Sequence, residues 1–256
     1  MLLMKSNILT LSEVSFSYNG VKAVSNLTMS IKKGSITSLI GPNGAGKTTA
    51  FKLICGEIHP QDGNIFYKGE KINSFSPHQI AARGIAWTFQ NICLFPSLTV
   101  REHINLSQYT RYKASLLDAI IGTPLIKQER MILARRTEEI MKRLRLEEYA
   151  DEPAVNLPYG LQRRVEFARA LGVGPTIILL DEPTAGMNIQ ESNDIMELIK
   201  GLTNIDIAIL LIEHDMRVVM NISSEVWVMN EGTIISSGNP EEVRRDPVVI
   251  KAYLGE

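Results

Sequence analysis

Hydrophobic and polar residues alternate with a period of two through much of the first thirty residues. This alternation predicts two β-strands joined by a turn at Asn19-Gly20. Residues 65–67 and the Lys68-Gly69 turn continue the pattern, so an antiparallel β region is expected at the edge of the core. The apolar positions of the first two strands are Leu9, Leu11, Val14, Phe16, Leu27, Met29 and Ile31.

A short helix is predicted after this region by its capping residues. Ser76 is suited to the N-cap, Pro77 to the first helical position, and Gln79 completes a capping box with Ser76. Gly84 is placed to end the helix.

The pattern changes between about Val100 and Tyr149, where strand signals disappear. Apolar residues recur there at helical spacing between charges, and Gly122-Thr123-Pro124 interrupts any helix. We interpret this region as a helical insertion. The apolar series is Leu133, Thr137, Ile140, Met141 and Leu144, with Thr137 as its one polar member.

After Pro158 helices and strands alternate again. Such alternation predicts a mostly parallel sheet, whose ligand sites lie at the carboxyl ends of the strands. The expected elements are helices at 162–171 and 192–202, strands at 176–180 and 207–212, a hairpin at 226–235 and a final helix capped by Asn239.

Size and charge narrow the functions that this chain can perform. Its 256 residues are 45% apolar and 21% charged, which suits a globular protein with a sizeable core. A net charge of −1 gives no general attraction to nucleic acid, so no nucleic-acid partner is expected. Apolar runs such as residues 177–180 are far too short to cross a bilayer, and we expect any membrane role to come through partners.

Two cysteines provide no disulfide framework, which fits a reducing compartment. Cys55 lies on the apolar side of an expected helix, and a packed, inert thiol is the favoured interpretation.

The segment from Gly41 to Thr48 matches the phosphate-binding pattern G-x-x-x-x-G-K-[ST] at every position. A short apolar strand at 35–40 precedes it, and a helix is expected from Thr49 to Cys55, which is the context the pattern requires. Glycines let backbone N–H groups approach phosphate oxygens, and the helix N-terminus adds positive potential. Lys47 is expected to reach the β- and γ-phosphates and Thr48 to bind Mg²⁺. An ordinary glycine-rich turn is the alternative.

Carboxylates end a second apolar strand, where Asp181-Glu182 follows residues 176–180. Asp181 is expected to hold Mg²⁺, and Glu182 to orient and deprotonate the attacking water. A solvated acidic turn would contain the same residues. His214 follows another apolar strand and is expected near the γ-phosphate, although a hydrogen-bonded turn histidine is also possible.

Taken in order, these motifs resemble the ATP-binding subunits of the ATP-binding-cassette (ABC) family over essentially the whole chain. The further matching segments are Gln90, which corresponds to the Q-loop glutamine, the signature segment Leu157-Pro158-Tyr159-Gly160-Leu161-Gln162, and the loop Ala185-Gly186-Met187-Asn188. Tyr18 falls where these proteins stack an aromatic ring on adenine, a contact worth ~1–3 kcal/mol by analogy with other base–aromatic pairs.

The resemblance implies an α/β P-loop NTPase fold in a single domain spanning 1–256. Its expected parts are an antiparallel β region with the phosphate-loop core (1–99), a helical subdomain with the signature (100–160) and the remaining α/β core (161–256). It implies ATP and Mg²⁺, with Thr48, Gln90 and Asp181 at the metal, and Glu182, His214 and Lys47 as catalytic residues. The implied ATP-binding residues are Tyr18, Gly41, Pro42, Asn43, Gly44, Ala45, Gly46, Lys47, Thr48, Thr49, Gln90 and Gly160.

Within the family, three segments resemble the ATPases of branched-chain amino acid importers: 159–166, 182–188 and 252–256. That resemblance implies a second ATPase subunit, permease subunits and, indirectly, a solute-binding protein as partners. It implies a peripheral location on the cytoplasmic face of the inner membrane. In such proteins the signature of one subunit closes over ATP on the phosphate loop of another. Residues 89–100 are apolar enough for a docking surface, and core packing explains the same letters equally well.

This chain departs from the family at three positions. Pro158 replaces the usual signature serine, Leu161 a common glutamine, and Asn188 the usual aspartate, although asparagine is common in this subgroup. Proline has neither a side-chain nor a backbone donor, so we expect a weaker grip of the signature on ATP.

Three alternatives differ in solute or class. An importer for urea or another small solute would use the same motifs. A soluble ABC ATPase of DNA repair or translation usually carries tandem cassettes, coiled-coil arms or basic segments, and none is evident. A P-loop kinase would leave Gln90, the signature and His214 unexplained.

Overall fold

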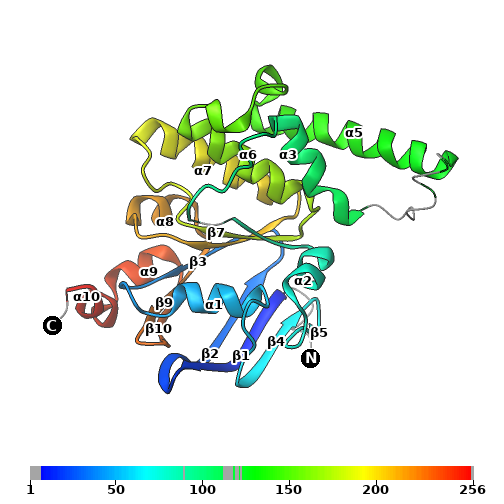
Figure 1. Ribbon diagram of the computed structural model, residues 1–256. Coiled ribbons are helices and arrows are strands. Elements are labelled where there is room, and N and C mark those ends of the chain that lie inside the picture. The colour runs from blue at the N-terminus through cyan, green and yellow to red at the C-terminus, as the bar shows by residue number, and fades with distance from the viewer. Residues whose placement is uncertain (1–6, 89, 112–117, 119–120, 122, 255–256) are drawn as a thin grey trace. The chain divides into compact units, whose positions relative to one another are not determined.

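A computed structural model describes residues 7–88, 90–111, 118, 121 and 123–254 of the chain. The chain divides into two compact units (Figure 1). The first contains the residues up to Gln90 together with those from Thr176 onward, and the second contains Asn91–Pro175. The first six residues, Phe89, and Gly255 and Glu256 of the 252–256 segment lie outside the described residues.

The first unit contains the expected antiparallel sheet, with strand order β2-β1-β4-β5. Leu11 faces Met29 across β1 and β2, and Leu9 faces Tyr67 across β1 and β4, so the predicted apolar positions share the buried side. The tight turn at Asn19-Gly20 uses left-handed backbone at both residues, which asparagine and glycine tolerate. The strands are β1 (Asn7–Tyr18), β2 (Val21–Lys32), β4 (Asp62–Tyr67) and β5 (Glu70–Lys71).

A six-stranded sheet forms the rest of the framework, in the order β10-β9-β3-β8-β7-β6. All its neighbouring strands are parallel except β9 and β10, which form the predicted hairpin. Every residue of β3, β7 and β8 is buried, which explains their unbroken apolar runs. The strands are β3 (Ile36–Ile40), β6 (Ile85–Thr88), β7 (Ile177–Asp181), β8 (Ala208–Ile212), β9 (Glu225–Asn230) and β10 (Thr233–Gly238).

The helices of the first unit begin at strong caps. Ser76 and Gln79 form the predicted capping box, and Gly84 ends that helix in left-handed backbone. Asn188 and Asn239 form similar boxes, whereas the helices after Asp215 and Asp246 were missed because their apolar patterns are short. The helices are α1 (Lys47–Ile54), α2 (Pro77–Arg83), α7 (Ile189–Thr203), α8 (Met216–Ile222), α9 (Pro240–Arg245) and α10 (Pro247–Leu254).

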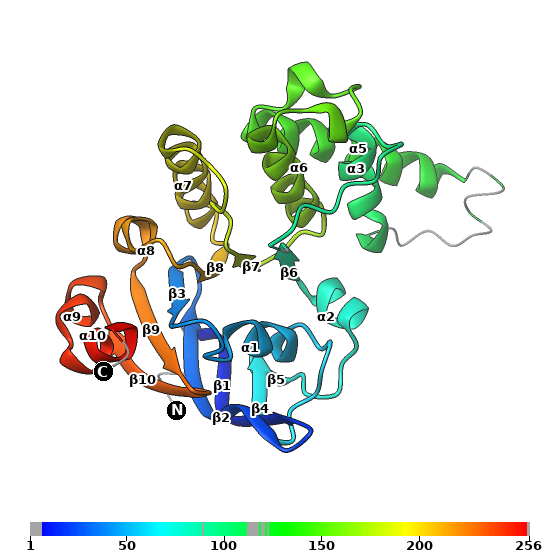
Figure 2. The same cartoon turned by 60° about the vertical axis from the view of Figure 1, so that its left-hand side comes forward.

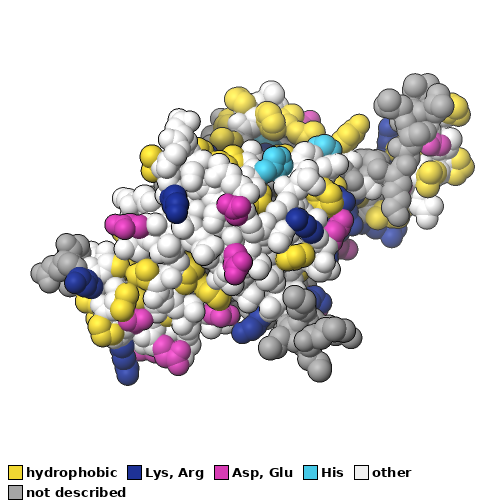
Figure 3. Space-filling model, turned by 90° about the horizontal axis from the view of Figure 1, so that it is seen from below, with side chains coloured by type: hydrophobic (Ala, Val, Ile, Leu, Met, Phe, Trp, Pro, Cys, Tyr) yellow, Lys and Arg dark blue, Asp and Glu magenta, His cyan; other side chains and the backbone are white. Residues whose placement is uncertain are grey.

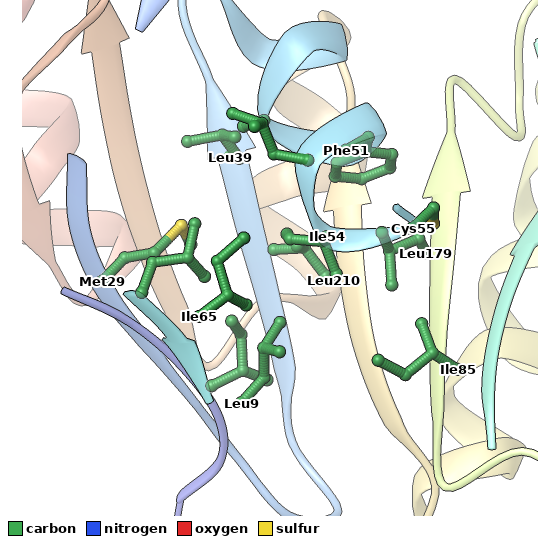
Figure 4. Close-up of a cluster of buried hydrophobic side chains, with 14 of the residues drawn as sticks. Leu9, Met29, Leu39, Phe51, Ile54, Cys55, Ile65, Ile85, Leu179 and Leu210 are labelled. Atoms are coloured by element: carbon green, nitrogen blue, oxygen red, sulfur yellow. The ribbon is translucent and has the colours of Figure 1, made fainter. Parts of the chain in front are cut away.

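The main core of this unit joins α1 to both sheets (Figure 4). Phe51 and Ile54 of α1 are fully buried among side chains of β1, β3, β4, β7 and β8. Burial of each such side chain contributes about 1.5–3 kcal/mol, so the helix that follows the phosphate loop is firmly fixed. Cys55 is also buried, and this burial raises the pKa of its thiol. The thiol stays protonated and unreactive, as predicted.

The second unit is helical. Its helices are α3 (Val100–Ser107), α5 (Pro124–Leu144) and α6 (Tyr159–Gly172), with short 3-10 turns η2 (Tyr109–Arg111), η3 (Glu147–Tyr149) and η4 (Ala154–Asn156). The unit spans Asn91–Pro175 and so differs from the expected range of 100–160, because α6, expected in the α/β core, packs against α3 and α5. The predicted apolar series of α5 is buried. Its one polar member, Thr137, is satisfied by hydrogen bonds: its hydroxyl accepts from Gln108 Nε2 and donates to the Leu133 oxygen.

No helix among the described residues is long and apolar enough to cross a bilayer. On the face shown in Figure 3, acidic and basic side chains are interspersed among polar and apolar ones. Mixed charge of this kind agrees with the chain's net charge of −1.

Candidate functional site

The candidate site lies at one edge of the parallel sheet of the first unit. Strands β3, β8, β7 and β6 lie side by side and run the same way (Figure 2), so the segments that follow them emerge at the same edge. Those segments begin with Gly41 after β3, Glu213 after β8, Glu182 after β7, and Gln90 just beyond β6. The fold therefore gathers motifs that are far apart in the sequence.

Two glycines shape the phosphate loop because the surrounding backbone leaves no room for a side chain. A Cβ on Gly41 would lie 2.0 Å from the Met229 carbonyl oxygen, and one on Gly46 would lie 2.2 Å from that of Ala23. Both residues also have positive φ angles, 152° and 102°. The loop is therefore wedged between β2 and the β9–β10 hairpin, and Gly232 N–H adds a 3.0 Å bond to the Ala45 oxygen. No sequence pattern predicted that β2 and the β9–β10 hairpin contact the phosphate loop.

The helix after the loop is open at its N-terminus. α1 begins at Lys47, two residues before the expected start, because Gly46 in left-handed backbone ends the loop. Gly46 has no side chain, so no side-chain cap occupies the first N–H groups of α1. Uncapped N–H groups at a helix N-terminus are suited to an anion. Within the loop, Asn43, Gly44 and Thr48 are exposed, Pro42 and Thr49 are partly buried, and Ala45 is buried.

Lys47 turns its ammonium back over the loop. Nζ donates to the Gly41 oxygen at 2.7 Å and to the Pro42 oxygen at 2.9 Å. Partial burial lowers the pKa of Lys47, while the carboxylates of Glu182 and Asp181 act in the opposite direction. An ammonium has three N–H donors, and two of them serve the loop itself. The cation is thus bound to the glycine loop and attracted by the two acids at the end of β7, Asp181 and Glu182.

Glu182 is at the centre of the predicted catalytic group. Its Oε2 accepts a 2.7 Å bond from Gln90 Nε2, and its Oε1 lies 3.6 Å from His214 Nδ1. Its backbone is left-handed (φ 46°), an uncommon state for a non-glycine residue that is typical of functional sites. Asp181, one residue earlier, is only 6% exposed. The structure brings together Lys47, Asp181, Glu182, Gln90 and His214.

Two other predicted residues lie outside this group. Tyr18 ends β1 with 43% exposure and packs edge-on against Phe16 at 4.8 Å. It pairs with Val21 in the hairpin that leads to Ala23, the residue against Gly46, so its exposed ring lies on the strand pair that supports the loop. Gly160 lies in the first turn of α6 in the second unit and is partly buried.

The signature helix starts without a side-chain cap. α6 begins at Tyr159, three residues before the predicted start, and Pro158 occupies the N-cap position. The Pro158 oxygen accepts bonds from Leu161 and Gln162 N–H, but its ring supplies no donor. Gln162 instead donates its side-chain amide to the Leu157 oxygen at 2.8 Å.

The oxygen donors at this edge are of the kind that Mg²⁺ prefers. Among the described residues no group of three or more His, Cys, Asp or Glu side chains is arranged to hold a metal. Mg²⁺ is commonly bound through one or two carboxylates together with substrate phosphates and water. Asp181 at the end of β7 and the exposed hydroxyl of Thr48, at the start of α1, supply oxygen donors of this kind.

A glycine loop between a parallel strand and a helix, with carboxylates at the end of another strand of the same parallel sheet, defines a P-loop nucleotide-binding protein. The ABC transporter family profile matches residues 24–185, and a profile of branched-chain amino acid ATP-binding cassette transporters matches residues 233–256. The chain belongs to the ABC transporter family, and its enzyme class is that of an ATPase. The α/β fold is confirmed by this membership.

Known proteins with similar sequences and structures match this chain along nearly its full length. The chain is 40% identical over 254 residues to the high-affinity branched-chain amino acid transport ATP-binding protein LivG of Salmonella typhimurium, covering 99% of this chain and 100% of that protein. It also resembles a nucleotide-free ATP-binding cassette from an ABC transporter (TM-score 0.85, 29% identity, covering 98% and 100%). A bacterial ABC transporter cassette solved as a dimer gives a TM-score of 0.75 at 26% identity, covering 91% and 98%.

Proposed function

We propose that this chain hydrolyses ATP to energise the uptake of branched-chain amino acids through separate permease subunits. The observation that carries the proposal is the convergence of the phosphate loop, Asp181, Glu182, Gln90 and His214 at one sheet edge. The transported solute is inferred from the full-length similarity to LivG and from the match at residues 233–256.

ATP would bind with its triphosphate in the glycine loop. The loop N–H groups and Lys47 would contact the phosphates, Thr49 would follow them into α1, and Tyr18 would stack on the adenine. Thr48, Asp181 and Gln90 would hold Mg²⁺, which when bound neutralises charge on the β- and γ-phosphates.

Glu182 is the proposed general base. A carboxylate held by Gln90 on one oxygen can accept a proton from water on the other, and His214 on the Oε1 side can orient that water. Asp181 ends β7 and Glu182, with left-handed backbone, follows it, so one strand end carries two acids with different proposed tasks.

His214→Ala tests the proposed role of the imidazole. The side chain is 66% exposed, so its removal should cost little stability, while kcat for ATP should fall roughly 100-fold with little change in KM. Steady-state phosphate release measures both constants. His59→Ala, which removes an exposed histidine of the same unit, is the control and should keep the parent rate. A parent-like kcat in His214→Ala would remove histidine from the mechanism.

The complete machine would contain two ATPase chains. Gly160 N–H and the start of α6 are suited to an anion, and the family resemblance places them over ATP on a partner. Closure of the pair would then move the permease. The predicted docking segment, residues 89–100, is the candidate permease contact: within it Phe95 is 48% exposed, and its N–H donates to the buried His103 Nε2 at 2.9 Å. A solute-binding protein would act through the permease, on the far side of the membrane from this peripheral subunit.

Pro158→Ser tests the weak signature. Serine would add a capping hydroxyl and a donor toward the γ-phosphate, worth about 1–2 kcal/mol. ATP hydrolysis in the assembled complex should become several-fold faster. Pro153→Ser, an exposed proline ahead of η4, is the matched control and should change nothing. An unchanged or lower rate in Pro158→Ser would contradict the prediction that Pro158 weakens the grip of the signature on ATP.

Transport assays test the solute directly. The chain, co-expressed with permease and solute-binding subunits of a branched-chain amino acid importer, should form a membrane complex whose ATPase is stimulated by leucine, isoleucine or valine. Stimulation by urea alone would assign a different solute, and recovery of an active enzyme without any membrane subunit would favour a soluble ABC ATPase.

A further inference from the structure

A buried glutamate next to the proposed catalytic histidine has no role in the scheme above. Glu213 directly follows β8 and is 1% exposed. Its Oε1 accepts bonds from Thr184 N–H at 3.2 Å and from the Thr184 hydroxyl at 2.5 Å. Its Oε2 accepts from His214 N–H at 3.1 Å and Asp215 N–H at 3.4 Å. A buried carboxyl group is costly unless both oxygens are satisfied, and here each oxygen serves a different loop.

The two loops are those that carry Glu182 and His214. Thr184 follows Glu182 by two residues after β7, and His214 is the residue after Glu213. The ladder of β7 and β8 ends at the pair Asp181 and Ile212, and Glu182 N–H donates to the Ile212 oxygen at 2.9 Å. Beyond that bond both segments continue as loops. Among the described residues, the Glu213 carboxyl group joins the two loops beyond this point by accepting hydrogen bonds from both.

The distance between the side chains of Glu182 and His214 makes the link through Glu213 important. His214 Nδ1 lies 3.6 Å from Glu182 Oε1 and 4.0 Å from Glu213 Oε2, beyond a normal hydrogen bond in both cases. The pair is therefore placed by the loops that carry it. We propose that Glu213 is a positioning residue, which holds His214 against Glu182 by fastening the loop after β8 to the loop after β7. The inference rests on the ATPase activity of the chain.

Both carboxyl oxygens of Glu213 must act as acceptors to link the two loops. A glutamine at this position would have nearly the same shape, but its NH₂ group would face N–H donors on one side. Glu213→Gln should therefore loosen one loop without leaving a cavity. Thr184→Val removes only the hydroxyl bond and keeps the volume, whereas Thr184→Ser keeps the hydroxyl.

The first measurement is steady-state ATP hydrolysis by the full chain in its transport complex. Glu213→Gln should lower kcat roughly tenfold, with KM for ATP within about twofold of the parent, since losing one such bond corresponds to about that factor. Thr184→Val should lose several-fold and Thr184→Ser should approach the parent rate. Tyr67→Phe is the control: it removes a buried hydroxyl that bonds Thr176 in the same unit and should leave kcat unchanged.

The second measurement asks whether Glu213 acts through His214. In single turnovers on the His214→Ala background, adding Glu213→Gln should change the residual rate by less than about twofold, because the residue it positions is gone. A further tenfold loss on that background, or a raised KM with unchanged kcat, would overturn the proposal. If Glu213→Gln does not fold, equal parent-like rates in Thr184→Val and Thr184→Ser would overturn it. A parent chain without ATPase activity would instead refute the ATPase assignment on which the inference rests.

Discussion

Lys47→Ala is expected to abolish ATP binding. The ammonium is the cation that is bound to the glycine loop and attracted by the two acids at the end of β7. Without it, the triphosphate would meet Asp181 and Glu182 with less compensating positive charge. Hydrogen bonds to charged groups are worth about 1.5–3 kcal/mol each, so the Kd for Mg-ATP should rise at least ~100-fold.

Calorimetric titration with Mg-ATP measures this change. Lys52→Ala is the matched control because Lys52 lies in the last turn of the same helix, away from the loop, and it should bind ATP like the parent chain. Equal thermal unfolding of both variants would show that the fold is intact. A Lys47→Ala chain that binds ATP within threefold of the parent would contradict the assigned phosphate contact.

Glu182→Gln is expected to have the second large effect, of the opposite kind: this variant should bind ATP without hydrolysing it. Glutamine keeps the shape of the side chain, and its amide oxygen can still accept from Gln90 Nε2, but it cannot take a proton from water. General-base catalysis contributes about 10²–10⁴-fold, so kcat should fall by at least 100-fold. ATP affinity should be equal or higher because one negative charge beside the phosphates is removed.

A closed dimer should accumulate in this variant. With ATP present and hydrolysis blocked, the proposed pairing of two ATPase chains persists, and light scattering should report twice the monomer mass. Glu225→Gln is the control, since Glu225 starts β9 at the opposite edge of the sheet and pairs with Lys32 at 3.4 Å. Turnover of Glu182→Gln at the parent rate would mean that the assigned base is wrong.

Most helices and strands could be predicted from the sequence because apolar spacing and capping residues mark them locally. Alternating apolar residues predicted β1 and β2, the Ser76–Gln79 box predicted α2, and unbroken apolar runs predicted β3, β7 and β8. Helix starts were less accurate: α1 and α6 begin two and three residues early, because Gly46 and Pro158 set the first turn. Placing α6 in the α/β core failed because packing between helices distant in sequence decides that question.

Site residues could be predicted where they lie at or just after the end of a strand. Parallel strands bring Lys47, Asp181, Glu182 and His214 to one edge by topology alone, so motif and strand together located them. The parts that were missed depend on tertiary contacts. Met229 limits Gly41 only through its backbone oxygen, which leaves no mark in the sequence. Glu213 did offer a signal, an acidic residue at the end of a buried strand, but its partner Thr184 is visible only in the folded chain.

The most direct test of the account is a crystal structure of Glu182→Gln grown with ATP and Mn²⁺, using the anomalous signal of manganese to locate the metal. The account predicts a triphosphate against the N–H groups of residues 44–48, with Lys47 on its terminal phosphates and manganese between Thr48 and Asp181. An empty loop with the nucleotide bound elsewhere, or manganese away from both residues, would contradict it.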